Sequence, residues 1–290
     1  MIAVTGANGQ LGRLVIRALL KSVAPTKVIA TVRNRDKAAE LVASGVEVRL
    51  ADYDRPETLE MALAGVEKVL LISGNAVGKR VPQHRAVIEA ARKAGVRLFG
   101  YTSVLRAPST ALAVGPEHRE TEALIKSSGI NWVILRNGWY SENYVNRAAA
   151  AAGSGVLVGC AGEGRISAAT RADYAAAAAA ALTKPDQAGR TYELAGDDSF
   201  TLPQFTSELS SQLGRKIAYR NVSEDEFRAA LEASGIPSIY AALMAKSDAA
   251  TSEGALLESS RQLSWLIGRS TTPIAAVVAE AIRDGRLPRN

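Results

Sequence analysis

The residues best suited to do chemistry stand near the start of the chain, in the stretch Thr5-Gly-Ala-Asn-Gly-Gln-Leu-Gly12. Three glycines, each three residues apart, lie between a short apolar run at 2–4 and a segment at 11–20 whose apolar residues recur at helical spacing. A strand, a glycine turn and a helix in that order form a site for the pyrophosphate of a dinucleotide, because the backbone comes close and the helix N-terminus offers free N–H groups. The pattern therefore predicts a dinucleotide site, and the alternative is an ordinary loop.

The end of the second expected strand indicates which dinucleotide binds. Residues 27–32 form that strand, and Thr31-Val-Arg33-Asn-Arg35 closes it. NAD-binding folds carry a carboxylate near this point, which accepts hydrogen bonds from the ribose hydroxyls. Arg33 stands there instead, and a guanidinium suits a 2′-phosphate. We expect NADPH as the cofactor, with NADH weaker; the alternative is a solvated arginine at a strand end.

Two further strand ends carry candidate cofactor contacts. Asp52 follows the third expected strand, where it either bonds the adenine amino group or caps the helix that Pro56 begins. Ser73-Gly-Asn75 follows the fourth, and small residues there let the backbone run beside the ribose and nicotinamide. A plain turn would have the same composition. Thr102-Ser103 follows the fifth strand, where it either binds a substrate carbonyl oxygen or only caps the strand end.

The segment after the sixth expected strand, 131–135, combines polar and aromatic residues. It reads Asn137-Gly-Trp-Tyr-Ser-Glu-Asn-Tyr144 and leaves the sheet at the edge where cofactors bind. Asn137 and Gly138 are expected near the nicotinamide. Trp139, Tyr140 and Tyr144 are expected to line a pocket for an aromatic acceptor. The alternative is an apolar anchor for the second domain.

These sites require a particular fold. Six strands that alternate with helices predict an α/β protein, a Rossmann-type doubly wound parallel sheet over residues 1–136. Residues 137–290 form a smaller α+β lobe expected to cover the nicotinamide end, although parts of it can return to the sheet. Within this lobe Thr201 is expected to cap one helix, and Ser223 with Glu226 to form a capping box.

Composition narrows the function classes. The chain has 290 residues, is 47% hydrophobic, and carries a formal net charge of +6 with no run of five like charges, so nucleic acid is not the expected partner. Its single cysteine, Cys160, fits a reducing compartment. No signal peptide or membrane span is expected, which favours the cytoplasm. Two histidines without metal spacing predict no metal site.

One absent motif bears on the reaction. Short-chain dehydrogenases use Tyr-x-x-x-Lys as a general acid, but none of the eight tyrosines has a lysine four residues later. Reduction of a simple ketone needs a positioned proton donor. A quinone escapes this need because its reduced anion is delocalised, and a cationic dye carbon that receives hydride needs no proton.

Longer strings reveal a resemblance. They are MIAVTGANGQLG at 1–12, ADY at 51–53, VEKVLLIS at 66–73, PQHR at 82–85, EHRETE at 117–122, LRNGWYSENY at 135–144 and ATRADYAAAA at 169–178. The chain resembles the flavin-free NAD(P)H:quinone oxidoreductases of the NmrA-like, atypical short-chain dehydrogenase family, and is also similar to triphenylmethane dye reductases. The resemblance implies an acceptor between two lobes and no flavin. It implies cofactor contacts by Gly6, Ala7, Asn8, Gly9, Gln10, Leu11, Arg33, Ser73, Gly74, Asn75, Asn137, Gly138, Trp139, Tyr140, Ser141 and Glu142.

Related isoflavone-type reductases carry a catalytic lysine at a register that falls on His118 here. Its imidazole could orient the acceptor or supply a proton, and a structural histidine is the alternative. The expected activity is direct hydride transfer from NADPH to a quinone stacked near Tyr140, Asn143 and Tyr144. The alternatives are reduction of triphenylmethane dyes or other conjugated electrophiles, or a redox sensor that binds NADP(H) without turnover. The expected assembly is a monomer or homodimer.

Overall fold

The computed structural model describes residues 1–287, which divide into two compact units. Unit 1 comprises Met1–Ala107, Pro116–Asn137 and Arg171–Tyr192. Unit 2 comprises Pro108–Gly115, Gly138–Thr170 and the chain from Glu193 onward. The units are therefore not continuous in sequence, because 171–192 returns to the unit that holds the N-terminus.

A seven-stranded sheet forms the centre of unit 1, in the order β3-β2-β1-β4-β5-β6-β8. Its strands are β1 Ile2–Val4, β2 Val28–Val32, β3 Glu47–Leu50, β4 Lys68–Leu71, β5 Leu98–Val104, β6 Trp132–Asn137 and β8 Arg190–Leu194. Every neighbouring pair from β3 to β6 is parallel. The doubly wound parallel sheet is thus confirmed, and β8, which the sequence assigned to the C-terminal region, extends it beyond β6.

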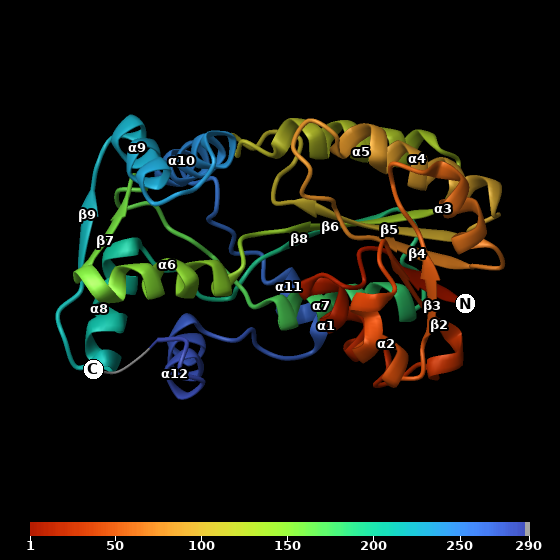
Figure 1. Ribbon diagram of the computed structural model, residues 1–290, viewed down its shortest axis with the longest axis horizontal. Coiled ribbons are helices and arrows are strands. Elements are labelled where there is room, and N and C mark those ends of the chain that lie inside the picture. Colours follow the sequence, from red (N-terminus) through yellow and green to blue (C-terminus); the bar gives the residue numbers. More distant parts are fainter. Residues whose placement is uncertain (288–290) are drawn as a thin grey trace. The chain divides into compact units, whose positions relative to one another are not determined.

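Helices cover both faces of this sheet, with α3, α4 and α5 on one face and α1, α2 and α7 on the other (Figure 1). Their bounds are α1 Gln10–Leu19, α2 Ala39–Ala43, α3 Pro56–Leu63, α4 Arg80–Lys93, α5 Gly115–Ser127 and α7 Arg171–Thr183. Because both faces are covered, β2 and β5 are buried along their whole length. Fully buried Ile29, Val69 and Phe99 lie in the core between the sheet and the helices.

Unit 2 contains a small parallel sheet of two strands with helices around it. Its elements are α6 Ser141–Ser154, β7 Val156–Gly159, α8 Leu202–Leu213, β9 Ala218–Asn221, α9 Glu224–Ala233, α10 Ser238–Ser252, α11 Gln262–Ile267 and α12 Ile274–Arg283. The capping boxes at Thr201 and Ser223 are present, each with its side chain accepting a backbone N–H and the third helical residue returning the bond.

The sequence did not predict α6 or α11, and it predicted a helix over 237–245 where α10 extends to Ser252. Asn143 and Tyr144 therefore lie on a helix rather than in a loop. Six residues are too few for α11 to show a periodic pattern, and in the second half of α10, residues 246–252, alanine is the only apolar residue type, so the apolar stripe is weak there. The start of α6 was missed for a related reason, because the polar and aromatic residues at 137–144 form no apolar stripe at helical spacing.

A substitution at Gly12 tests the packing of α1 on the glycine turn. A Cβ at Gly12 would lie 2.4 Å from the carbonyl oxygen of Gly6 and 2.7 Å from the Cα of Ala7, and neither backbone atom can move freely. We expect Gly12→Ala to lower the free energy of unfolding by about 1–3 kcal/mol. Urea denaturation followed by circular dichroism measures this loss.

The matched control is Gly153→Ala, near the end of α6, where a Cβ meets nothing within 4 Å. Alanine is the better helix former there, so the free energy of unfolding should stay the same or rise by up to about 1 kcal/mol. If Gly12→Ala were as stable as this control, the close approach of α1 to the turn would not constrain the fold.

Candidate cofactor site

The glycine turn lies where the strand order reverses, between β2 on one side of β1 and β4 on the other. Backbone hydrogen bonds hold it to both neighbours: the Ala7 N–H donates to the Thr31 oxygen at 3.2 Å, and the Thr5 N–H donates to the Leu70 oxygen at 2.9 Å. Gly6 has a φ of +61°, which a glycine adopts without strain. The sequence and the strand order therefore place this turn where dinucleotides bind in such sheets.

The N-terminus of α1 is left open toward a ligand. Gly9 precedes the helix in an extended conformation, provides no side-chain cap, and is followed by no acidic residue in the first turn. The first N–H groups of a helix have no partner within it, and the helix dipole adds partial positive charge. Asn8 donates to the Asn34 oxygen at 3.1 Å, while its own Oδ1 is buried without a partner. These features fit the phosphates of a dinucleotide.

Arg33 lies just beyond β2 with an exposed side chain and makes no hydrogen bond or ion pair to the described residues. Its neighbour Asn34 shapes the turn, because its Oδ1 accepts the Asp36 N–H at 2.8 Å. By contrast, Arg13 and Arg17 on α1 both pair with Glu40. The Arg33 guanidinium thus keeps its donors available for an anionic group.

Asp52 makes its hydrogen bonds within the turn that leads from β3 to α3. Its Oδ1 accepts the Asp54 N–H at 3.1 Å, and its own N–H donates to the Thr58 hydroxyl at 2.9 Å. The residue that precedes α3 is Arg55, which provides no side-chain cap. Asp52 therefore stabilises the approach to α3 without capping the helix itself.

Side chains from neighbouring strands hold the segment that follows β4. The Thr102 hydroxyl accepts the Ser73 N–H at 2.9 Å. The Ser103 hydroxyl donates to Glu122 at 2.7 Å. The sequence placed both hydroxyls after the fifth strand, but they lie within β5 and are engaged within unit 1. The side chains of Ser73 and Asn75, by contrast, make no hydrogen bond to the described residues.

A buried ion pair fixes the end of β6 to α5. Arg136 donates through Nε and Nη2 to the two carboxylate oxygens of Glu122, at 2.9 and 2.7 Å. Burial raises the pKa of Glu122, but the bonds from Arg136 and Ser103 more than offset it and leave the pKa below its usual value. The carboxylate is therefore ionised at neutral pH, and the bidentate geometry holds the backbone that leads into the next segment.

The last residue of β6 and the first residue of α6 each carry a buried polar atom without a partner among the described residues. Asn137, at the end of β6, is 5% exposed with an unpaired Oδ1. Ser141, the first residue of α6, is fully buried with an unpaired Oγ, and its N–H donates to the Ala169 oxygen at 2.9 Å. Gly138 donates its N–H to Leu194 at 2.8 Å. A buried polar atom without a partner is costly, so each of these is a candidate ligand contact.

The aromatic and polar side chains that follow divide into two groups. Trp139, Tyr140, Glu142 and Asn143 are half-buried. Tyr144 is only 3% exposed and packs edge-on against Phe200 and Phe205, with ring centroids 5.4 and 6.1 Å apart. Burial raises the pKa of its phenol. Tyr144 thus lies in an aromatic core of unit 2, as the anchor alternative expected.

His118 is buried in the first turn of α5, where its Nδ1 lies 2.7 Å from the Tyr101 hydroxyl. Burial, reinforced by the charge of Arg80, lowers its pKa well below the usual value. The imidazole is therefore neutral at neutral pH and occupied by a protein partner. This environment favours the structural alternative over proton supply.

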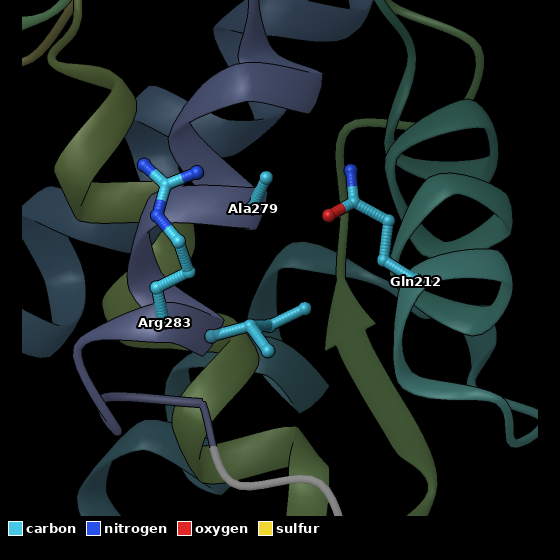
Figure 2. A pocket seen from close by; sticks show the side chains of 4 residues that line it. Gln212, Ala279 and Arg283 are labelled. Atoms are coloured by element: carbon cyan, nitrogen blue, oxygen red, sulfur yellow. The ribbon is translucent and has the colours of Figure 1, made fainter.

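Other chemical groups among residues 1–287 offer no second site of this kind. Cys160 is buried, and burial raises the pKa of its thiol to about 12. No group of three or more His, Cys, Asp or Glu in this part of the chain could hold a metal ion. No helix within it is long and apolar enough to cross a membrane. A pocket of about 420 Å³ lies between α8 and α12, and Figure 2 shows the side chains that line it. They are Gln212, Ala279, Ile282 and Arg283, and none of these was a candidate site residue in the sequence.

A family model described as NAD(P)H-binding matches residues 6–185. The match begins at the glycine turn and extends to the end of α7. The chain therefore belongs to the NAD(P)H-binding family.

Individual proteins are similar to this chain in both sequence and structure. The chain is 50% identical to quinone oxidoreductase 2 of Escherichia coli over 96% of its own length and 98% of that protein. Its structure matches the crystal structure of an E. coli NADPH-dependent quinone oxidoreductase complexed with NADPH, with a TM-score of 0.95, 50% identity and coverage of 97% and 100% of the two chains. It also matches the Citrobacter triphenylmethane reductase complexed with NADP(H), with a TM-score of 0.93, 39% identity and the same coverage. Both resemblances seen in the sequence are confirmed.

The buried histidines predict how stability depends on pH. Burial lowers the pKa of His84 from 6.5 to about 3, so below about pH 6.5 the unfolded chain binds a proton that the folded protein does not. The free energy of unfolding should therefore fall on acidification, by about 2 kcal/mol at pH 5 from His84 alone. His118 acts in the same direction.

Urea denaturation at about pH 7 and about pH 5 measures this fall. The variant His84→Gln, which cannot take up a proton at this position, should show a smaller fall than the parent protein. Paired carboxylates such as Glu40 and Glu122 do not affect this comparison. Their pKa values are lowered in the folded protein, so their contribution to the free energy of unfolding is lost only at more acidic pH. Equal falls for parent and variant would mean that His84 is already protonated in the folded state.

Proposed function

We propose that this protein is an NADPH-dependent reductase that transfers hydride directly to a quinone without a flavin. The observation that carries the proposal is its similarity to quinone oxidoreductase 2 over nearly the full length of both chains. The open glycine turn supports the cofactor half of the proposal, as does Arg33, whose side chain pairs with none of the described residues. The cytoplasmic location and the monomeric or dimeric state expected from the sequence remain predictions.

The chain offers distinct groups for the parts of the cofactor. The N–H groups that open α1 would hold the pyrophosphate, and Arg33 would pair with the 2′-phosphate. Ser73, Asn75 and Asn137 would contact the nicotinamide half. When bound, the reduced nicotinamide supplies a hydride, and the protein contributes by holding it near the acceptor.

The acceptor half of the proposal follows from the proton donors that the chain lacks. There is no Tyr-x-x-x-Lys pair, and His118 is neutral and bonded to Tyr101. An acceptor whose reduced anion is stable needs no acid within the site, and a quinone meets this condition. We propose that Tyr140 and Asn143 contact the quinone and that Tyr144 supports them from the aromatic core of unit 2.

A second candidate acceptor is a triphenylmethane dye. The similarity to the Citrobacter triphenylmethane reductase favours it, and such a dye takes hydride at a cationic carbon without needing a proton. The two acceptors share a flat, conjugated ring system, so one aromatic surface could serve both. A sensor that binds NADP(H) without turnover is the alternative from another class.

The first prediction is turnover with a quinone in the absence of flavin. Purified protein whose visible spectrum shows no flavin should oxidise NADPH in the presence of 1,4-benzoquinone or a naphthoquinone. The readout is the loss of the near-ultraviolet absorbance of NADPH, with a triphenylmethane dye tested in parallel. Tight NADPH binding without turnover of any acceptor would replace the enzyme with the sensor.

The second prediction concerns cofactor choice at Arg33. Replacing the guanidinium in Arg33→Asp removes charge-assisted hydrogen bonds to the 2′-phosphate and adds a repulsive charge. We expect KM for NADPH to rise roughly 10-fold to 100-fold, while KM for NADH stays the same or falls. Steady-state kinetics with each cofactor at a fixed quinone concentration gives the ratio.

The control for this change is Lys21→Asp. Lys21 is exposed just after the C-terminal end of α1, so it alters the net charge equally at the opposite end of that helix. Its preference for NADPH over NADH should match the parent protein. An unchanged preference in Arg33→Asp would show that Arg33 does not contact the 2′-phosphate.

A further inference from the structure

The backbone of residues 72–78, which follows β4 without helix or strand, is held at each end and at its centre by side chains from other elements. The Thr5 hydroxyl accepts the Ile72 N–H at 3.2 Å, and Glu117 accepts the Gly78 N–H at 3.2 Å. At the centre, Gly74 is bonded through both of its backbone groups. His84 Nε2 accepts its N–H at 3.0 Å, and Arg80 Nε donates to its oxygen at 2.8 Å.

His84 can accept this bond only in one protonation state. Its Nδ1 lies 3.1 Å from the Thr121 hydroxyl, and that hydroxyl donates its proton to the Glu117 carbonyl oxygen at 2.8 Å. Thr121 can therefore only accept from His84, which places the imidazole proton on Nδ1 and leaves the Nε2 lone pair for Gly74. These hydrogen bonds form a relay in which every donor points the same way: the Gly74 N–H donates to His84, His84 to Thr121, and Thr121 to the backbone of α5.

The surroundings keep the imidazole in that state. His84 is fully buried, and the Tyr101 ring packs against it with centroids 5.4 Å apart at 75°. The charged and titratable groups around it are Arg80 on α4, Tyr101 on β5, and Glu117 and His118 on α5. Burial and then the charge of Arg80 lower the pKa of His84 to about 3. A cationic His84 would turn a second donor toward the Gly74 N–H and break the relay.

We propose that neutral His84 is a positioning residue that fixes the Ser73–Asn75 backbone to receive the nicotinamide half of NADPH. The inference rests on the proposed function, since it takes this segment as a cofactor contact. His84 does not touch the cofactor in this account. It acts through Gly74, while the side chains of Ser73 and Asn75 stay free of partners within the described residues.

The test compares two substitutions at His84. His84→Phe keeps a planar ring but leaves the Gly74 N–H without an acceptor, whereas His84→Gln places an amide oxygen near the position of Nε2. We expect His84→Phe to raise Kd for NADPH about 10-fold, and His84→Gln to recover most of the affinity. Isothermal titration calorimetry gives Kd, and steady-state kinetics should show a matching rise in KM for NADPH with little change in KM for the quinone.

A cofactor fragment separates positioning from general damage. Adenosine 2′,5′-bisphosphate carries the adenine half and the 2′-phosphate but no nicotinamide, so its Kd should be the same for His84→Phe and the parent protein. Equal weakening of NADPH and of this fragment would overturn the proposal, because it would indicate a disturbed fold. Full NADPH affinity in His84→Phe would overturn it as well.

A second site tests the relay without changing His84. Thr121→Val removes the acceptor for the Nδ1 proton, so the imidazole N–H is left buried without a partner and the ring loses the bond that orients its Nε2 toward the Gly74 N–H. We expect the same selective loss of NADPH affinity as in His84→Phe. Nitrogen NMR shifts of His84 should report a neutral Nδ1–H form in the parent protein, and an Nε2–H form there would contradict the proposal.

The control is Gln187→Leu, which also removes a buried hydrogen-bonding side chain from unit 1. Gln187 accepts a hydrogen bond from the Tyr192 hydroxyl at 2.9 Å and donates to the Pro185 oxygen at 2.8 Å, and among the described residues its side chain makes no hydrogen bond to residues 72–78. The Gln187→Leu variant should have a lower free energy of unfolding than the parent protein but the same Kd for NADPH. A parent protein that binds NADPH yet turns over no quinone would overturn the proposed function alone, since the binding tests of His84 remain informative.

Discussion

The close approach of α1 to the turn before it sets the geometry of the candidate phosphate site in unit 1. Gly12 packs so tightly on Gly6 and Ala7 that even a methyl group would meet backbone atoms at under 3 Å. Because the turn is also bonded to β2 and β4, the open end of α1 is fixed where the strand order reverses. The direction of the helix and the place of its free N–H groups follow from that single contact.

The other strand ends are fixed in a different way, by side chains rather than by glycines. The segment after β4 is held by Thr5, Thr102, His84 and Arg80, and the end of β6 is held by the ion pair of Arg136 with Glu122. Buried polar groups of this kind are costly unless each has a partner. Those after β4 satisfy backbone groups that regular structure leaves open, and the side chains of Ser73 and Asn75 make no hydrogen bond to other described residues.

Within unit 2, apolar and ionic contacts hold the start of α6. Tyr144 on α6 is inserted among Phe200 and Phe205. One turn further along, Arg147 pairs with Asp248 of α10 at 2.8 Å and lies over the Phe227 ring. These contacts fix the helix that begins at Ser141, and so the orientation of Tyr140 and Asn143 at its start.

The sequence by itself determined the parts whose signal is local. Glycine spacing, apolar runs and capping residues predicted β1 to β6, the helices between them, the cap at Thr201 and the capping box at Ser223. The family could be read from long strings of residues, and the comparisons confirm it. These features need only neighbours in the chain, because turn geometry and helix periodicity are set within a few residues.

Only the tertiary structure decided how distant residues are paired. The sequence did contain a signal for the hydrogen bonds around His84: polar residues recur four apart on two helices, as Arg80 and His84 and as Glu117 and Thr121. This spacing does not show which backbone segment those side chains contact in the folded chain. The same holds for β8, whose sequence does not show that it joins β6, and for Tyr144, whose aromatic partners lie more than fifty residues away. Pairing across such distances depends on how the elements pack, and packing is a property of the folded chain.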